Sequence, residues 1–290
     1  MDHMFGPRIE ARVSMNRPLY RLLLVFLGIT LSFWPMSGQT DDRWKSLATG
    51  IEYGSFQVTP LPEIGTGTIH VVRIDPSKAK LKFFLASEYD SKSRTTAQWV
   101  KEFSLVSAIN AGMFQKDLLT NVGYLRNGSH IQNNRWNSQY KSALAFDPKT
   151  EGVPAAILID LDEPGAMKSL SDYNAVVQNL RLMKGDGVNV WAKQEKKWSE
   201  AAVAMDGDGR ILFLFCRSPL TMRDFNAAVA STGLGVSRMM HMEGGALASL
   251  SIRSTAITLD VAGSHEAMIN ATETNQEQWP IPNVVGVQSR

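Results

Sequence analysis

The sequence contains a single cysteine, Cys216, so no disulfide can form within the chain. Cys216 ends the apolar run I-L-F-L-F-C, and we expect it to be a small buried side chain. The motifs H-E-x-x-H, the P-loop and G-x-S-x-G are all lacking, and the five histidines are scattered. The sequence therefore supports neither zinc chemistry nor a serine hydrolase, and it predicts no metal and no cofactor.

An excess of one charge is also lacking. The chain has 30 lysines and arginines against 28 aspartates and glutamates, and the small basic excess lies within residues 1–38. The remainder is formally neutral, which argues against nucleic acid or an anionic membrane as a partner. Because hydrophobic residues make up 44% of the chain, it can build one large core or two small ones.

The apolar run Leu22 to Trp34 is too short to cross a bilayer, which takes about 20 residues. It follows Arg17 and Arg21, which is typical of an export signal. We expect residues 1–38 to be an export segment, with Met15 as the true start of translation. Its removal would leave no membrane span and a periplasmic or extracellular protein. An uncleaved N-terminal anchor is the alternative.

Residues 39–59 are polar and predict a lead-in, whereas residues 60–290 carry short apolar runs without a long linker and predict one domain. Period-two patterns predict strands at residues 80–87, 142–147, 155–160, 203–215 and 257–262. D-G-D-G-R at 206–210 lacks the later ligands of a calcium loop, so we interpret it as a hairpin turn within the fourth of these segments.

Two segments predict helices, 95–103 with Thr95 or Thr96 as N-cap and 221–233 with Thr221 as N-cap and Gly233 at its end. Strand patterns outnumber helical ones and do not alternate with them regularly. The predicted fold class is therefore α+β, with a mixed, largely antiparallel β-sheet core and a few flanking helices.

Several short motifs place polar groups beside probable strand ends. Asn110 lies in I-N-A-G-M-F after a predicted strand, and Glu243 lies in M-E-G-G. Arg217 directly follows an apolar strand and precedes the capped helix at 221–233, so that Arg217 and the helix N-terminus could form an anion site. Each motif is weak alone, and a rim residue or a turn is the alternative for each.

The order of these motifs, with G-Y-L-R-N-G at 123–128 and W-P-I-P-N-V-V-G-V at 279–287, resembles the phosphodiester glycosidase family over residues 60–290. That family includes a hydrolase that removes N-acetylglucosamine from its phosphodiester link to mannose-6-phosphate. The resemblance matches Asn110–Phe114 to the family's Asn-Gly-Gly-Phe-Phe and Met242–Gly245 to its Leu-Asp-Gly-Gly. This chain departs from the pattern at Ala111, at Cys216, and at Glu243, which replaces an aspartate.

The resemblance implies hydrolysis of a sugar-1-phosphodiester, with a carbohydrate or sugar phosphate as partner. Glu243 would be nucleophile or base, Arg217 would hold the phosphate, and Asn110 would bind a sugar hydroxyl. Residues expected to contact the substrate are Gly112, Gly123, Arg126, His241, Gly244 and Gly245. The second carboxylate is left open between Asp206, Asp117 and Glu200. The rival hypothesis is a non-catalytic envelope protein that binds a glycan, and the three departures are what it predicts.

Overall fold

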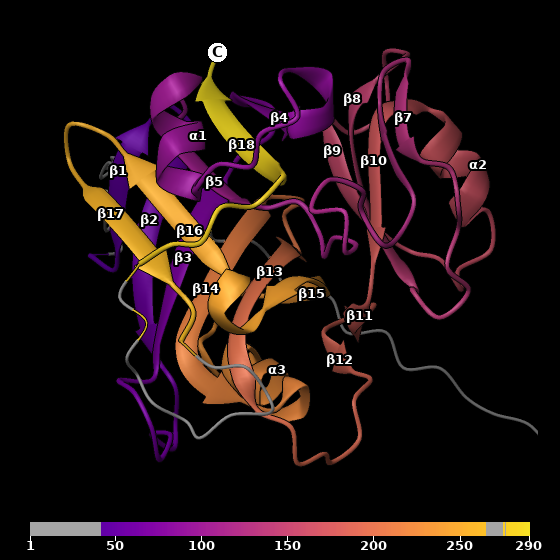
Figure 1. Cartoon of the computed structure of the whole chain (residues 1–290). Helices are drawn as coiled ribbons and strands as arrows, with labels where there is room; N and C mark the ends of the chain where they lie inside the picture. The colour runs from indigo at the N-terminus through magenta and orange to yellow at the C-terminus, as the bar shows by residue number, and fades with distance from the viewer. Residues whose placement is uncertain (1–41, 265–274, 276) are drawn as a thin grey trace, which may run out of the picture. The chain divides into compact units, whose positions relative to one another are not determined.

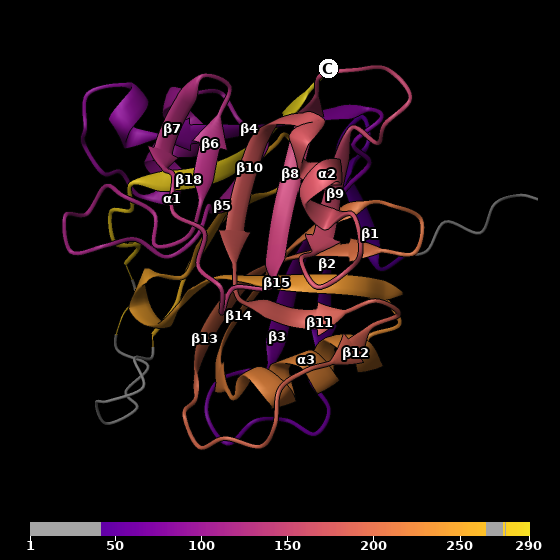
Figure 2. The ribbon, with the colours of Figure 1, turned by 90° about the vertical axis from the view of Figure 1, so that its right-hand side faces the viewer.

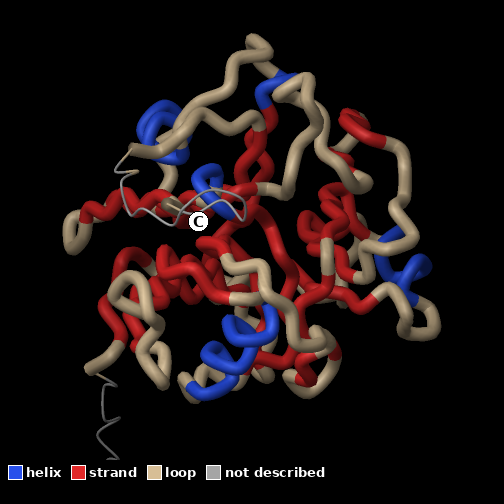
Figure 3. The backbone as a smooth tube through the Cα atoms, turned by 60° about the horizontal axis from the view of Figure 1, so that its bottom comes forward, coloured by secondary structure: helices blue, strands red, loops and turns tan. Residues whose placement is uncertain are grey.

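The computed structural model describes residues 42–264, 275 and 277–290, all of which belong to one compact unit. The export segment predicted for residues 1–38 lies outside the described residues. Within these residues, strands dominate and helices are few (Figures 1 and 3). None of the described helices is long and apolar enough to span a bilayer.

The largest sheet has eight strands, and each neighbouring pair is antiparallel. In spatial order they are β1 (Trp44–Ala48), β2 (Ile51–Gln57), β3 (Thr68–Ile74), β14 (Ile211–Leu220), β13 (Trp198–Asp206), β15 (Val236–Gly244), β11 (Arg181–Lys184) and β12 (Val188–Asn189). β1 and β2 lie in the segment 39–59 that we expected to be a lead-in. Their outward polar side chains hide the strand character, while Ile51 and Phe56 are buried.

Two five-stranded sheets complete the β structure, and their strand pairings are antiparallel as well. One runs β7 (His130–Asn133), β6 (Leu125–Asn127), β10 (Tyr173–Asn179), β8 (Ser142–Pro148), β9 (Ala156–Asp160). The other runs β17 (Thr258–Ala262), β16 (Ser249–Arg253), β5 (Ser107–Asn110), β18 (Asn283–Ser289), β4 (Ala79–Leu85). No described strand pairing is parallel, which agrees with the largely antiparallel core that we predicted. Strands outnumber helices so strongly among the described residues that the structure is richer in β than the α+β class we predicted.

Three α-helices and two 3-10 turns are present among the described residues. They are η1 (Ala86–Glu88), α1 (Thr96–Glu102), α2 (Ala166–Ser171), α3 (Met222–Ser231) and η2 (Gly245–Leu247). Thr95 caps α1 in a reciprocal capping box with Gln98, and Thr221 caps α3 by accepting from the backbone N–H of Asp224. Gly233 follows α3 with a φ of 75°, a left-handed conformation that suits glycine. The sequence thus predicted α1 and α3 with their caps, but not α2.

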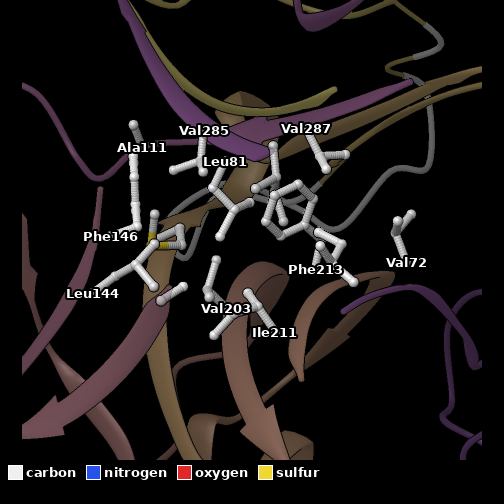
Figure 4. Packing of buried hydrophobic residues seen from close by; sticks show 14 of the residues in the cluster. Val72, Leu81, Ala111, Leu144, Phe146, Val203, Ile211, Phe213, Val285 and Val287 are labelled. Carbon is white, nitrogen blue, oxygen red and sulfur yellow. The ribbon is translucent and has the colours of Figure 1, made fainter. Parts of the chain in front are cut away.

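The main hydrophobic core lies where the three sheets meet. Figure 4 shows side chains from the three sheets close to one another. They include Leu81 of β4, Val285 of β18, Leu144 and Phe146 of β8, and Val203 of β13. The opposite face of the large sheet is covered by α3 (Figure 2). Phe225 and Val229 of α3 belong to a second hydrophobic cluster, which includes Leu212 and Leu214 of β14. Both faces of β13 and β15 are therefore buried, which fixes the positions of their side chains.

Candidate active site

A pocket of about 290 Å³ opens at the end of β15. Its described lining residues are Met113, Leu180, Trp198, Met222, His241, Glu243, Gly244 and Gly245. They come from the segment after β5, the junction of β10 and β11, β13, α3, β15 and η2. The volume lies at the small end of the range for ligand sites, which suits a single ring better than an extended chain. His241 and Glu243 are the ionisable groups in this lining.

A larger hollow, of about 390 Å³, lies between residues 58–64 and α3. Its charged residues include Lys197 and Glu63, which face solvent and pair with each other at 3.4 Å. Solvated charges of this kind contribute little binding energy. The pocket at the end of β15 is therefore the better candidate.

His241 is held by a buried carboxylate from the neighbouring strand. Its Nδ1 lies 2.5 Å from Oε1 of Glu200, and the other oxygen of Glu200 accepts a hydrogen bond of 2.8 Å from Nε1 of Trp198. The exposed fractions of His241 and Glu200 are 3% and 2%, so the pair is shielded from solvent. Both carboxylate oxygens are occupied, which orients the imidazole ring firmly.

The charge of this pair follows from two opposing effects. Burial of His241 would lower its pKa, but the negative charge and hydrogen bond of Glu200, together with the charge of Glu243, raise it above its ordinary value of 6.5. The imidazole therefore keeps its second proton to a higher pH than an ordinary histidine does. An ion pair of this kind inside a protein is a common sign of a functional site.

Glu243 is also buried, with 7% of its surface exposed, and its Oε1 accepts a hydrogen bond of 3.0 Å from the N–H of Gly244. A β-bulge lies between Glu243 and His241. Glu243 pairs with Ala201 of β13 and His241 pairs with the next residue, Ala202, so β15 has one extra residue at this point. Both side chains nevertheless line the same pocket. Burial, and then the nearby charge of Glu243, raise the pKa of Tyr140, which places that hydroxyl close to the site.

Asn110, the last residue of β5, forms hydrogen bonds within the fold. Its Nδ2 donates to the carbonyl of Leu247 at 3.0 Å, and its Oδ1 accepts from the N–H of Ser249 at 2.8 Å. Only 1% of Asn110 is exposed. Its amide thus fastens η2, which carries Gly245 of the pocket, to β5, and it is absent from the described lining.

We expected Arg217 at the end of a strand. It lies within β14 instead, because the strand continues to Leu220. Its guanidinium donates to the backbone carbonyls of Ala262 and Asn275. Arg217 is outside the described lining of the pocket, and the described contacts do not join it to the N-terminus of α3.

The other residues predicted to contact substrate fall into two groups. His241, Gly244 and Gly245 line the pocket. Gly112 has a φ of 117° and packs against Asn121, so that a Cβ there would come within 2.5 Å of its Oδ1.

Gly123 and Arg126 lie at the second sheet. A Cβ on Gly123 would come within 2.4 Å of the carbonyl of Gln178, and Arg126 donates to the carbonyl of Tyr173. Both residues therefore contact the backbone of β10, and neither is part of the described pocket lining.

Of the three carboxylates considered as partners of Glu243, Glu200 lies beside the pocket. Asp206 is at the far end of β13, where it closes the β13–β14 hairpin and pairs with Arg210 at 2.7 Å, as expected for the D-G-D-G-R turn. Asp117 is exposed and accepts from the N–H groups of Leu119 and Thr120.

The sequence did not indicate the apolar wall formed by Met113, Leu180, Trp198 and Met222. Trp198 and Glu200 are two residues apart on one strand, a spacing that puts two side chains on the same face and could have drawn attention to them. Among the residues that the structure describes, no group of three or more His, Cys, Asp or Glu could hold a metal ion. Metal independence stays a prediction from the sequence.

One family model and two solved structures are similar to this chain. The family model for phosphodiester glycosidase matches residues 103–288, and no curated protein matches the chain. The catalytic domain of zebrafish N-acetylglucosamine-1-phosphodiester alpha-N-acetylglucosaminidase, auto-inhibited by its pro-peptide, is similar with a TM-score of 0.58 and 11% identity, covering 85% of this chain and 86% of that one. A hypothetical protein from Synechocystis has a TM-score of 0.55 and 14% identity, covering 85% and 64%. At these identities the structural likeness shows a shared fold alone.

Proposed function

This chain belongs to the phosphodiester glycosidase family, and on that premise we propose that it is an enzyme that hydrolyses a sugar-1-phosphodiester in a glycan or glycopolymer of the cell envelope. The observation that carries the proposal is the position of Glu243, a buried carboxylate in the wall of a small pocket and beside a histidine. A carboxylate at such a place can attack an anomeric carbon or activate water toward it.

Hydrolysis breaks the bond between the anomeric carbon and the phosphate oxygen, and the oxygen of water replaces it on the sugar. The leaving group is a phosphate monoester, which is a weak base and needs little protonation. What the site must supply is a carboxylate at the anomeric carbon and a positive group for the departing phosphate. Glu243 is our candidate for the first role. Glu200 cannot take it without breaking its bonds to Trp198 and His241.

For the second role, the sequence suggested Arg217. To act there, its guanidinium would have to exchange the carbonyls of Ala262 and Asn275 for phosphate oxygens. If it does, Arg217→Ala should slow hydrolysis of a phosphodiester about a hundredfold, about 3 kcal/mol, and that of an activated aryl glycoside much less.

One observation favours the second candidate function, a non-catalytic envelope protein that binds a glycan. Asn110 and Arg217 do not converge with Glu243 on the pocket, because both bind backbone groups elsewhere. A binder needs a shaped pocket but no convergence of catalytic groups. Sugar binding without turnover would be its signature.

The test is an activity screen of the purified protein against sugar-1-phosphodiesters and ordinary aryl glycosides, repeated with Glu243→Gln. We expect this variant to lose turnover while its thermal stability changes little, because glutamine keeps an oxygen for the N–H of Gly244. Asp260→Asn, which removes an exposed carboxylate paired with Arg253, is the matched control and should keep full activity. Full activity in Glu243→Gln would assign that residue a structural role and favour the glycan binder.

We further propose that the protein is exported, on the basis of the arginine-flanked apolar run at residues 22–34. Intact-mass analysis of protein recovered from the cell envelope should show the loss of about the first 35–40 residues, a typical signal length. Full-length protein recovered from the cytoplasm would contradict export.

A further inference from the structure

The pocket poses an electrostatic problem for a substrate that carries a phosphate. Glu243 lies in its wall, and Glu200 is hydrogen-bonded to His241 of the same wall, so two carboxylates lie near a ligand that is itself an anion. Like charges repel strongly in a site of low dielectric. Among the described lining residues, His241 is the one group that can be positively charged.

The geometry of His241 decides which atom can meet the ligand. Its Nδ1 is bonded to Glu200, whose other oxygen is held by Trp198. His241 lines the pocket, so Nε2 is the ring nitrogen available to a bound molecule. The carboxylate of Glu200 favours a proton on Nδ1. In the charged imidazolium form the ring carries a second N–H on Nε2, which can donate to an anionic oxygen.

We propose that His241 is the cation that binds the phosphate group of the substrate through Nε2, and that Glu200 is its positioning residue. This inference deepens the proposed function and rests on it for the identity of the substrate. It assigns to His241 the role that the sequence suggested for Arg217. It also explains why a carboxylate is buried behind the pocket with both oxygens bonded.

The reaction then balances without another charged group. On the direct route, Glu243 takes a proton from water as the water oxygen bonds to the anomeric carbon. On the covalent route, an oxygen of Glu243 bonds to that carbon as the phosphate leaves; water then attacks the carbon, the bond to Glu243 breaks, and the proton of water passes to solvent. The electron pair of the broken bond stays on the phosphate, where the N–H of His241 stabilises it by a charge-assisted hydrogen bond. On the direct route, the proton on Glu243 afterwards returns to solvent.

Several titratable groups lie around His241 and define its charge. From the elements packed against it these are Glu200, Cys216, Glu243, Tyr140 and Arg181. Burial raises the pKa of both Cys216 and Tyr140, so both are neutral near pH 7. Arg181 is bonded to Asp160 and Asp162, and α3 presents Met222 to the pocket. The two glutamates therefore dominate, and they raise the pKa of His241.

The test measures binding alone, so that it does not depend on turnover. The probe is an analogue of the methyl phosphodiester of N-acetylglucosamine in which CH2 replaces the anomeric oxygen. It cannot be hydrolysed at that bond, and its charge is constant between pH 5 and pH 10. Calorimetric titration gives Kd for the wild type, His241→Gln, Glu200→Gln and Glu200→Asp. Methyl N-acetylglucosaminide, which is neutral, is the reference ligand.

We expect His241→Gln to weaken binding of the charged probe at least tenfold and that of the neutral glycoside far less. As the pH is raised, affinity for the charged probe should be lost when His241 gives up its second proton. In Glu200→Gln this loss should occur at a lower pH than in the wild type, because the imidazolium lacks its stabilising carboxylate. Glu200→Asp should restore part of the wild-type pH profile. His70→Gln, which changes a half-buried histidine of β3 bonded to Tyr53, is the matched control and should bind as the wild type does.

Equal affinity in His241→Gln and the wild type, or an unchanged pH profile in Glu200→Gln, would overturn the inference. So would a wild type that does not bind the charged probe at any pH. If His241→Gln fails to fold, the imidazole nitrogen signals of wild-type His241 decide the matter, since an Nε2 signal unmoved by saturating probe excludes the contact. Binding through His241 without hydrolysis of any phosphodiester would refute the enzyme proposal and leave this inference standing.

Discussion

The indole of Trp198 occupies the space beside Gly244 that any larger residue would need. A Cβ built on Gly244 would lie 2.8 Å from Cδ1 of Trp198 and 3.1 Å from its Nε1. That same Nε1 donates to Glu200, which in turn holds His241. The first glycine of M-E-G-G therefore admits an aromatic ring that supports the site, a role separate from the substrate contact that the sequence predicted for it.

Gly244→Ala should displace Trp198 and loosen Glu200. The φ of Gly244 is −128°, which alanine tolerates, so the effect is steric and should cost about 1–3 kcal/mol of unfolding free energy. Activity should fall with it, and tryptophan fluorescence should report the movement of the ring. Gly207→Ala is the matched control, because a Cβ there has nothing within 4 Å. Equal stability of both variants would show that Trp198 can move away from the added methyl group without loss of stability.

Asn110→Ala should destabilise the protein and lower activity together. The substitution leaves the carbonyl of Leu247 and the N–H of Ser249 without their buried partner, which should cost about 1–3 kcal/mol. Urea unfolding measures this, with Asn174→Ala, which loses an exposed hydrogen bond to Asp147, as the control. Loss of activity at full stability would instead point to the sugar contact predicted from the sequence.

Stability should depend on pH through His241. Its pKa is higher in the folded protein than its ordinary value of 6.5, so its contribution to stability is complete below about pH 6.5 and is lost as the pH rises through the folded pKa. In that window the free energy of unfolding should fall by up to about 1.4 kcal/mol per pH unit. Urea unfolding at successive pH values should show this slope in the wild type. A slope that persists in His241→Gln would belong to another group.

Cys216 should resist thiol reagents in the folded protein. It is fully buried, and burial raises the pKa of its thiol to about 12, so little thiolate is present at pH 8. We expect no labelling by Ellman's reagent until the chain is unfolded in guanidinium. Rapid labelling of one thiol per chain under native conditions would mean that the region around β14 opens readily.

Local patterns in the sequence predicted much of the secondary structure. Leu81, Phe83 and Leu85 alternate along β4 and lie in one core cluster, as their spacing indicated. The caps at Thr95 and Thr221 likewise depend on residues within the next turn. Such features follow from neighbours in the chain and need no knowledge of the sheet order. α2 was missed because six residues are too few for a helical period to stand out.

Long-range pairing explains what the sequence could not predict. Glu200 and His241 are 41 positions apart and meet only through the register of β13 and β15. Arg217 appeared to end a strand because it follows the apolar run and precedes the capped helix, but β14 continues through Pro219 to Leu220. The pairing of β14 with β3 ends at Cys216, so beyond that point β14 has a partner on one side only, where proline is tolerated.

The spread of the pocket residues along the chain has a consequence for how the protein folds. Met113 and Gly245 stand at opposite ends of a stretch that includes strands of the eight-stranded sheet and all five strands of the sheet that contains β8 and β10, so local structure cannot form the pocket early. Closing such distant segments is slow compared with forming a hairpin. During refolding, the ability to bind a ligand should therefore return after the far-ultraviolet circular dichroism signal has recovered.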